Sequence, residues 1–78
     1  MDEAAQIREI IRRIKQVEQV SDTEDFFATG FLDSFDIINL VDELEKTFNM
    51  KIKGEDIIEE SFKSIETLAK LVMKMKHE

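Results

Sequence analysis

The stretch Phe31-Leu-Asp-Ser-Phe-Asp-Ile-Ile-Asn-Leu40 marks the point where a loop ends and a helix begins. Gly30 precedes it, and Asp and Ser, which both favour helix N-caps, stand just before an apolar pattern with helical spacing. Either Asp33 or Ser34 can cap this helix. If Asp33 is the cap, Asp36 takes the capping-box position. Ser34 then keeps its hydroxyl near unpaired backbone N–H groups, where the helix dipole favours a phosphate.

The apolar residues after Ser34 recur every three or four positions and predict a helix over residues 34–48. The same periodicity predicts a helix over residues 3–18, with Asp2 as a candidate cap, and a last helix that begins at Ser64. Residues 56–60 suffice for one short helix, and residues 18–33 indicate a long loop held by its own Phe side chains. The sequence therefore predicts an all-α fold, a small antiparallel bundle of three main helices plus one short helix, in a single domain over residues 1–78.

The composition of the 78 residues excludes several classes of protein. A net charge of −7 argues against nucleic-acid binding, and the absence of Cys excludes a disulfide framework or a Cys-based metal site. Residues 22–60 hold twelve acidic residues and three lysines, so the negative field lies in the middle of the chain and favours partners with basic surfaces. Apolar runs are short and the amino terminus is acidic, so we expect a cytoplasmic protein with no membrane insertion. We also expect a monomer.

Catalytic and metal-binding patterns are also missing from the sequence. The single His is His77, next to the carboxyl terminus, which is a poor place for a positioned base. Residues 22–33 have the length of a calcium-binding EF-hand loop. However, Phe26 and Phe27 stand where an oxygen ligand and a Gly are required, and Asp33 stands where a Glu is usual. We therefore expect neither an enzyme nor a metal site.

Three motifs together resemble the acyl carrier proteins: Gly30-Phe-Leu-Asp-Ser-Phe35, an isolated Ile52 followed by Gly54-Glu-Asp, and Ser61-Phe-Lys-Ser-Ile65. The resemblance covers residues 25–72. It implies that a phosphopantetheinyl transferase attaches 4'-phosphopantetheine from coenzyme A to Ser34, with Asp33 in a supporting role. It also implies that the thiol of this arm carries the cargo as a thioester, which accounts for a carrier without Cys.

The resemblance places the main partner surface on the helix over residues 34–48, where basic patches of acyl- or aminoacyl-loading and acyl-processing enzymes would dock. The partner contacts that it implies are Phe35, Asp36, Ile38, Asp42, Glu43 and Glu45. The candidates for lining an acyl cavity, which the plainer interpretation assigns to the core, are Val41, Leu44, Ile52, Ile57 and Phe62.

Several features leave the cargo and partners open. Asn39 and Lys46 stand where fatty-acid carriers usually have carboxylates, and Asp42 stands where they have an apolar contact. The implied function is to present acyl groups to enzymes of fatty-acid, polyketide or related biosynthesis. One alternative is an aminoacyl carrier of the D-alanyl or peptidyl type, which the two-residue spacing between Gly30 and Asp33 also resembles. The other is an unmodified helical protein-interaction domain.

Overall fold

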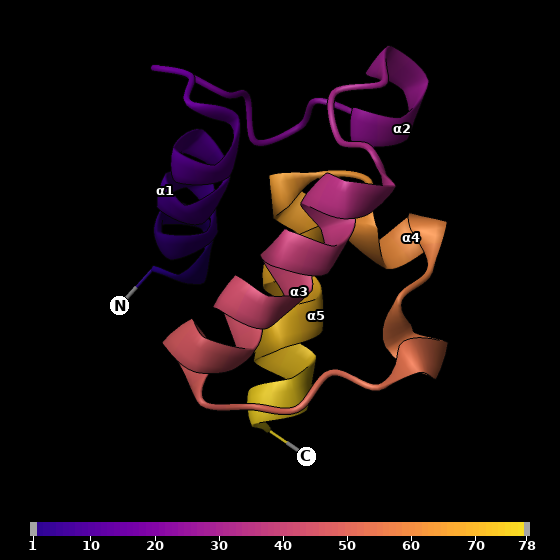
Figure 1. Ribbon diagram of the computed structural model, residues 1–78. Coiled ribbons are helices and arrows are strands. Elements are labelled where there is room, and N and C mark those ends of the chain that lie inside the picture. The colour runs from indigo at the N-terminus through magenta and orange to yellow at the C-terminus, as the bar shows by residue number, and fades with distance from the viewer. Residues whose placement is uncertain (1, 78) are drawn as a thin grey trace.

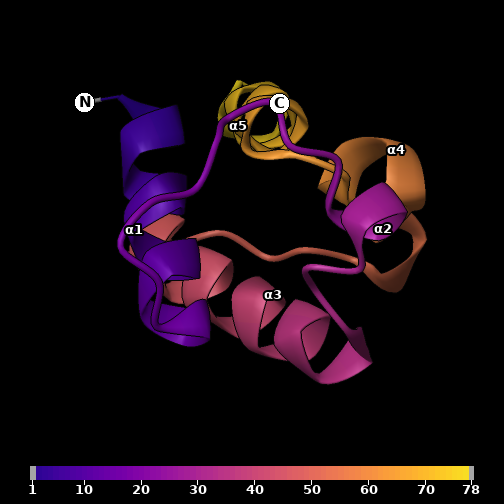
Figure 2. The ribbon, with the colours of Figure 1, turned by 90° about the horizontal axis from the view of Figure 1, so that it is seen from above.

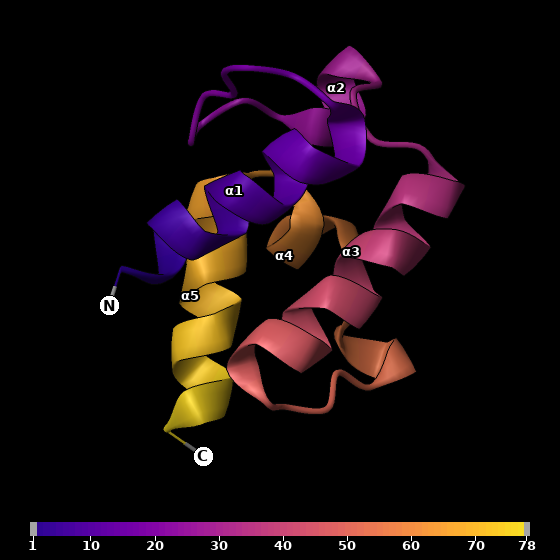
Figure 3. The same cartoon turned by 60° about the vertical axis from the view of Figure 1, so that its left-hand side comes forward.

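Three amphipathic helices form the frame of the protein: α1 (Glu3–Lys15), α3 (Ser34–Phe48) and α5 (Ile65–Lys76). The computed structural model describes residues 2–77. α1 packs against both α3 and α5, and it runs in the direction opposite to these two helices (Figure 1). α3 and α5 run the same way, so residues 49–64 must return the chain along the bundle (Figure 3). The prediction of a helical bundle is confirmed, and its antiparallel order holds for α1 against the other two helices.

Aliphatic and Phe side chains make up the core, as expected for a chain without Cys or Trp. Viewed from above, α1, α3, α4 and α5 lie around the centre of the molecule (Figure 2), and each contributes side chains to the core. Each buried side chain of this kind stabilises the fold by roughly 1.5–3 kcal/mol. The core residues are Ile7, Ile10, Ile11, Phe26, Leu32, Leu40, Leu44, Ile52, Phe62, Ile65, Leu68 and Val72.

The end of α1 differs from the prediction. The helix stops at Lys15 and not at residue 18, because Gln16 adopts a left-handed conformation with φ of 55°. The Val17 N–H then donates to the Arg12 carbonyl at 3.1 Å, which closes the last turn. At the other end, Asp2 accepts a hydrogen bond from the Ala4 N–H at 3.0 Å, so its predicted capping role is confirmed.

The loop before α3 contains a short helix that the sequence analysis missed, α2 (Phe26–Thr29). Asp25 caps it by accepting the N–H groups of Phe27 and Ala28, both at 3.0 Å, and Gly30 ends it with φ of 71°. Four residues cannot display a helical period, so only these two flanking residues signalled the helix. Phe26 is fully buried and its ring lies 5.6 Å from that of Phe31, which confirms that aromatic side chains hold this segment.

Hydrogen bonds tie the first loop to the rest of the bundle. Arg8 of α1 donates two hydrogen bonds of 2.8 Å to the Asp22 carboxylate, and the Asp22 carbonyl accepts the Glu66 N–H of α5 at 3.0 Å. The Phe26 N–H donates to the Lys63 carbonyl at 2.6 Å. These hydrogen bonds therefore fix the position of the first loop relative to α1 and the start of α5.

The short helix predicted over residues 56–60 is present with other bounds and is preceded by a further turn. The structure has a 3₁₀ turn, η1 (Gly54–Asp56), and then α4 (Glu59–Phe62). The Ile57 N–H donates to the Gly54 carbonyl at 3.1 Å to close η1. The first turn of α4 is closed by the Phe62 N–H, which donates to the Ile58 carbonyl at 3.1 Å. Burial of Phe62 in the core positions α4 one turn later, and this leaves Ile57 and Ile58 exposed between the two elements.

Candidate functional site

The first turn of α3 contains a complete capping box. The Asp33 carboxylate accepts the Asp36 N–H at 2.8 Å, and the Asp36 carboxylate accepts the Asp33 N–H at 3.1 Å. Asp33 is therefore the cap, which resolves the choice between Asp33 and Ser34. Ser34 is exposed at the first position of the helix, close to backbone N–H groups that have no partner within the helix. Its hydroxyl lies where the helix dipole favours a phosphate ester.

Asp36, which the resemblance implies as a partner contact, is buried within the protein. Its carboxylate accepts a hydrogen bond from the Lys15 ammonium of α1 at 2.7 Å. The capping box turns this carboxylate toward Asp33 and away from solvent. The hydrogen bond from Lys15, aided by that from the Asp33 backbone, holds the pKa of the Asp36 carboxyl below its ordinary value against the opposing effect of burial.

This pKa shift predicts an acid-sensitive fold. A carboxyl group whose pKa is lower in the folded state stabilises the fold above its unfolded pKa of about 3.9. That contribution is lost as the pH falls through the lower, folded pKa. The Arg8 guanidinium lowers the pKa of Asp22 in the same way. We expect the free energy of unfolding, measured by urea denaturation, to fall below about pH 5, and the fall to be shallower in Asp36→Asn. An equally steep acid branch in this variant would contradict the assignment.

The other three carboxylates predicted as partner contacts on α3 also have partners within the chain. Glu43 accepts a hydrogen bond from Arg13 at 2.9 Å, and Glu45 accepts the Ile52 backbone N–H at 2.8 Å. Asp42, which is exposed, pairs with Lys46 one turn later at 3.0 Å. The negative field of α3 is thus partly neutralised within the chain.

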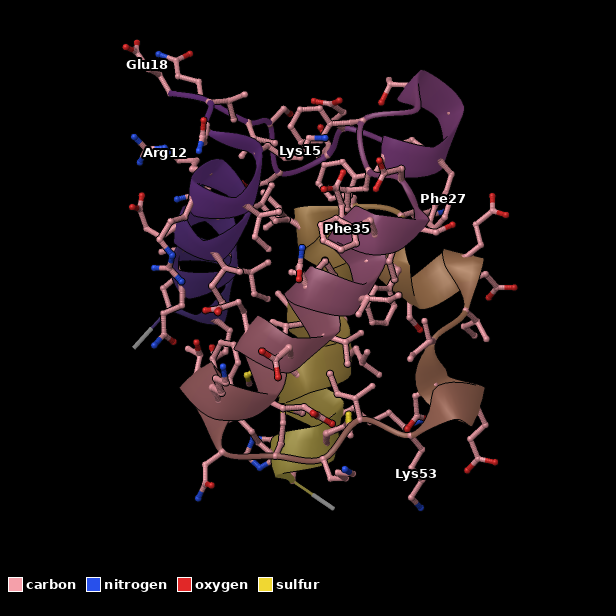
Figure 4. All side chains as sticks on the ribbon, viewed as in Figure 1. Arg12, Lys15, Glu18, Phe27, Phe35 and Lys53 are labelled. Carbon is pink, nitrogen blue, oxygen red and sulfur yellow. The ribbon has the colours of Figure 1, made fainter. Side chains whose placement is uncertain are left out.

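Apolar side chains gather around Ser34 instead. Among the described residues, six large apolar side chains are exposed, and the five other than Met73 lie on α2, the start of α3 or the segment before α4. Phe35 and Ile38 are the most exposed of them, at 69% and 66%. Figure 4 shows Phe35 projecting from the first turn of α3 and Phe27 projecting from α2. We call this set the Ser34 apolar surface: Phe27, Phe35, Ile38, Ile57 and Ile58.

Ser34 also lines an open groove of about 290 Å³ between the start of α3 and α4. Hollows of about 480 Å³ beside α5 and about 400 Å³ beside α1 are larger, but Ser34 lines neither of them. The lining of the Ser34 groove is apolar except for the serine and one carboxylate. Its residues are Phe27, Ser34, Ile37, Ile38, Ile57, Ile58, Glu59 and Phe62.

Comparison with known protein families decides the class of this chain. Residues 5–72 match the family model described as the phosphopantetheine attachment site. The chain belongs to this family. A comparison with curated proteins finds no match.

Family membership establishes the general role of the carrier. It is a non-catalytic carrier with a site for covalent attachment of 4'-phosphopantetheine, and it interacts with a phosphopantetheinyl transferase and with biosynthetic enzymes. This confirms the family, the cofactor and the absence of enzymatic activity that the resemblance implied. The group fits the start of α3, where an exposed hydroxyl adjoins an apolar groove.

The carrier brings together only part of the predicted acyl cavity. Ile57 and Phe62 line the Ser34 groove. Leu44 and Ile52 are buried in the core, and Val41 packs against it. Ile58 and Glu59 were not among the predicted cavity residues, because Ile58 lies between two short elements, Glu59 begins a helix of four residues, and neither shows a helical period.

Two further observations concern residues 2–77 only. Within this part of the carrier, no three or more His, Cys, Asp or Glu side chains are grouped so that they can hold a metal ion. None of the helices in the same part combines the length and apolar character needed to cross a lipid bilayer.

Proposed function

We propose that this carrier holds acyl intermediates as thioesters on a 4'-phosphopantetheine arm attached to Ser34. It presents them to enzymes of fatty-acid, polyketide or related biosynthesis. One observation carries the assignment: Asp33 fills the capping role, so the exposed hydroxyl of Ser34 remains available at the start of α3. When bound, the arm supplies the thiol that forms the thioester.

The residues around Ser34 suit this attachment. The N-terminal backbone of α3 favours the negative charge of a phosphodiester. Asp33 holds that backbone through its hydrogen bond to the Asp36 N–H, and so supports the site without contacting the cargo.

The lining of the groove favours an acyl cargo. Ile37, Ile57 and Phe62 offer aliphatic and aromatic surface next to the attachment point, and each methylene buried there stabilises the loaded carrier by about 0.8 kcal/mol. An aminoacyl cargo is the second candidate, because the carboxylate of Glu59 also lines the groove and can pair with an ammonium group.

The nature of the cargo can be tested by comparing two loaded forms of the carrier. An octanoyl thioester that enters the groove is expected to raise the free energy of unfolding by about 2 kcal/mol, equivalent to two or three buried methylenes. It should also slow amide exchange at Ile57 and Ile58. A D-alanyl thioester should change neither property. Stabilisation by D-alanyl alone, abolished by Glu59→Gln, would instead favour the aminoacyl carrier.

We further propose that partner enzymes dock on the Ser34 apolar surface. Phe35, Ile38 and Asp42 are spaced by three and four residues, so they share one face of α3. Apolar side chains at the centre of an interface commonly supply most of its binding energy, whereas charges at its rim act more on the rate of encounter. Asp42 and Glu43 then contribute at the edge of the interface.

The attachment itself is tested by intact mass spectrometry after incubation with coenzyme A and a broad-specificity phosphopantetheinyl transferase. We expect the mass of one phosphopantetheine to be gained, with the modified peptide containing Ser34. An unchanged mass in the presence of active transferase would overturn the proposal and leave an unmodified interaction domain as the alternative.

A further inference from the structure

Lys15, the last residue of α1, contacts the chain on both sides of the Asp33–Ser34 pair. Its ammonium lies 2.7 Å from the Asp36 carboxylate and 5.4 Å from the centre of the Phe31 ring. Figure 4 shows Lys15 at the end of α1. No sequence pattern points to this role, because Lys15 and Asp36 are far apart in the chain.

The contact with Asp36 acts directly on the backbone of the attachment site. One oxygen of Asp36, Oδ2, accepts both the Lys15 ammonium and the Asp33 N–H, the latter at 3.1 Å. The side chains of Lys15 and Asp36 are only 26% and 12% exposed, so water screens this pair less than an ordinary surface ion pair. Lys15 therefore fixes the oxygen that holds Asp33.

The contact with Phe31 acts on the segment before the site. A cation above an aromatic face is attracted to it, and the stem of a lysine covers apolar surface. Phe31 is in turn held by Phe26, whose ring lies 5.6 Å away and whose carbonyl accepts the Phe31 N–H at 3.0 Å. Lys15 thus holds Phe31 and Asp36, which stand on either side of Ser34 in the chain, against the end of α1.

We propose that Lys15 is a positioning residue for the modification of Ser34. It holds the Phe31–Asp36 segment in the arrangement that the transferase accepts. This inference rests on the proposed attachment at Ser34. Without Lys15, the largely buried Asp36 carboxylate would have no counter-ion and would turn toward water, which releases the Asp33 N–H. The first turn of α3 would then move more freely, although the core below it stays intact.

The test compares Lys15→Met, Lys15→Arg and Arg8→Met. Met keeps much of the apolar stem but removes the charge, whereas Arg keeps the charge. Arg8→Met is the matched control. It also removes an ion pair between α1 and the first loop, the one between Arg8 and Asp22, but this pair is far from Ser34 in the chain. All three variants should be compared with the wild type at a temperature at which circular dichroism shows them folded.

We expect Lys15→Met to lower the kcat of phosphopantetheine transfer by about tenfold, since small misplacements of a reacting group cost one to two orders of magnitude. The KM for coenzyme A should not change. Lys15→Arg should restore most of the rate, and Arg8→Met should stay within about twofold of the wild type. Amide exchange at Asp33 should accelerate only in Lys15→Met.

Two outcomes separate the possible failures. A folded Lys15→Met variant that is modified at the wild-type rate, with unchanged exchange at Asp33, would overturn the positioning role and leave the attachment at Ser34 intact. If no variant, including the wild type, gains mass, the attachment proposal fails. In that case faster amide exchange at Asp33 in Lys15→Met would still show that Lys15 holds the Asp33 backbone in place, and unchanged exchange would refute this.

Discussion

Ser34→Ala is expected to abolish the gain of phosphopantetheine mass and to leave the fold nearly unchanged. The loss is complete because no other hydroxyl occupies the first turn of α3. The fold is retained because Asp33 is the cap: its carboxylate accepts the Asp36 N–H at 2.8 Å, and this bond survives the substitution. Intact mass spectrometry measures the first effect and urea denaturation the second.

Two matched variants make this prediction specific. Ser21→Ala removes an exposed hydroxyl in the first loop, outside the site, and should be modified like the wild type. Asp33→Ala removes the cap and should lower the free energy of unfolding by about 1 kcal/mol, whereas Ser34→Ala should not. A mass gain that persists in Ser34→Ala would place the attachment elsewhere. A stability loss equal to that of Asp33→Ala would show that Ser34 shares the capping role.

Phe35→Asp is expected to weaken docking of partner enzymes by about thirtyfold, the effect of losing a hot-spot contact of about 2 kcal/mol. Phe35 is 69% exposed, so the free carrier gains little from its burial and the variant should fold normally. The new carboxylate would be desolvated wherever an apolar partner surface covers it. Binding to the transferase can be measured by titration calorimetry at low and at physiological salt.

The controls decide between apolar and electrostatic docking. Met73→Asp places the same charge on an exposed apolar position of α5 and should have no effect. Asp42→Lys should weaken docking by less than about fivefold, because Asp42 is largely solvated and already paired with Lys46. Suppose that Asp42→Lys weakens docking more than Phe35→Asp does, and that added salt weakens docking of the wild type. Carboxylates and not apolar side chains would then dominate the interface.

Much of the fold could be predicted from local patterns. The spacing of apolar residues identified the three main helices, and the bounds of α3 matched the prediction. Both the cap and the helical period depend on residues that are close together in the chain. The prediction failed where an element was too short to show a period, as in α2, or where burial of one side chain set the boundary, as Phe62 does for α4.

The candidate site was predictable to a similar degree. Asp33 and Ser34 were candidate caps from their types and positions, and the choice of Asp33 needed the hydrogen bonds. The attachment at Ser34 was implied by the resemblance and not by the local pattern. The burial of Asp36 was not predicted, because a helical pattern cannot show that Lys15 of another helix approaches it. The same limit hid Ile58 and Glu59, which reach the groove only because α4 folds back beside the start of α3.

The sequence by itself determined the helical bundle, the start of α3 and the presence of a hydroxyl there, since helix periods and caps depend on neighbours within a few residues. The tertiary structure decided which side chains surround that hydroxyl. Packing of α1 buried Asp36 under Lys15, and the return of residues 49–64 placed Ile57 and Ile58 beside Ser34. These contacts join residues distant in the chain, and they exist only because one core must bury the apolar faces of all the helices at once.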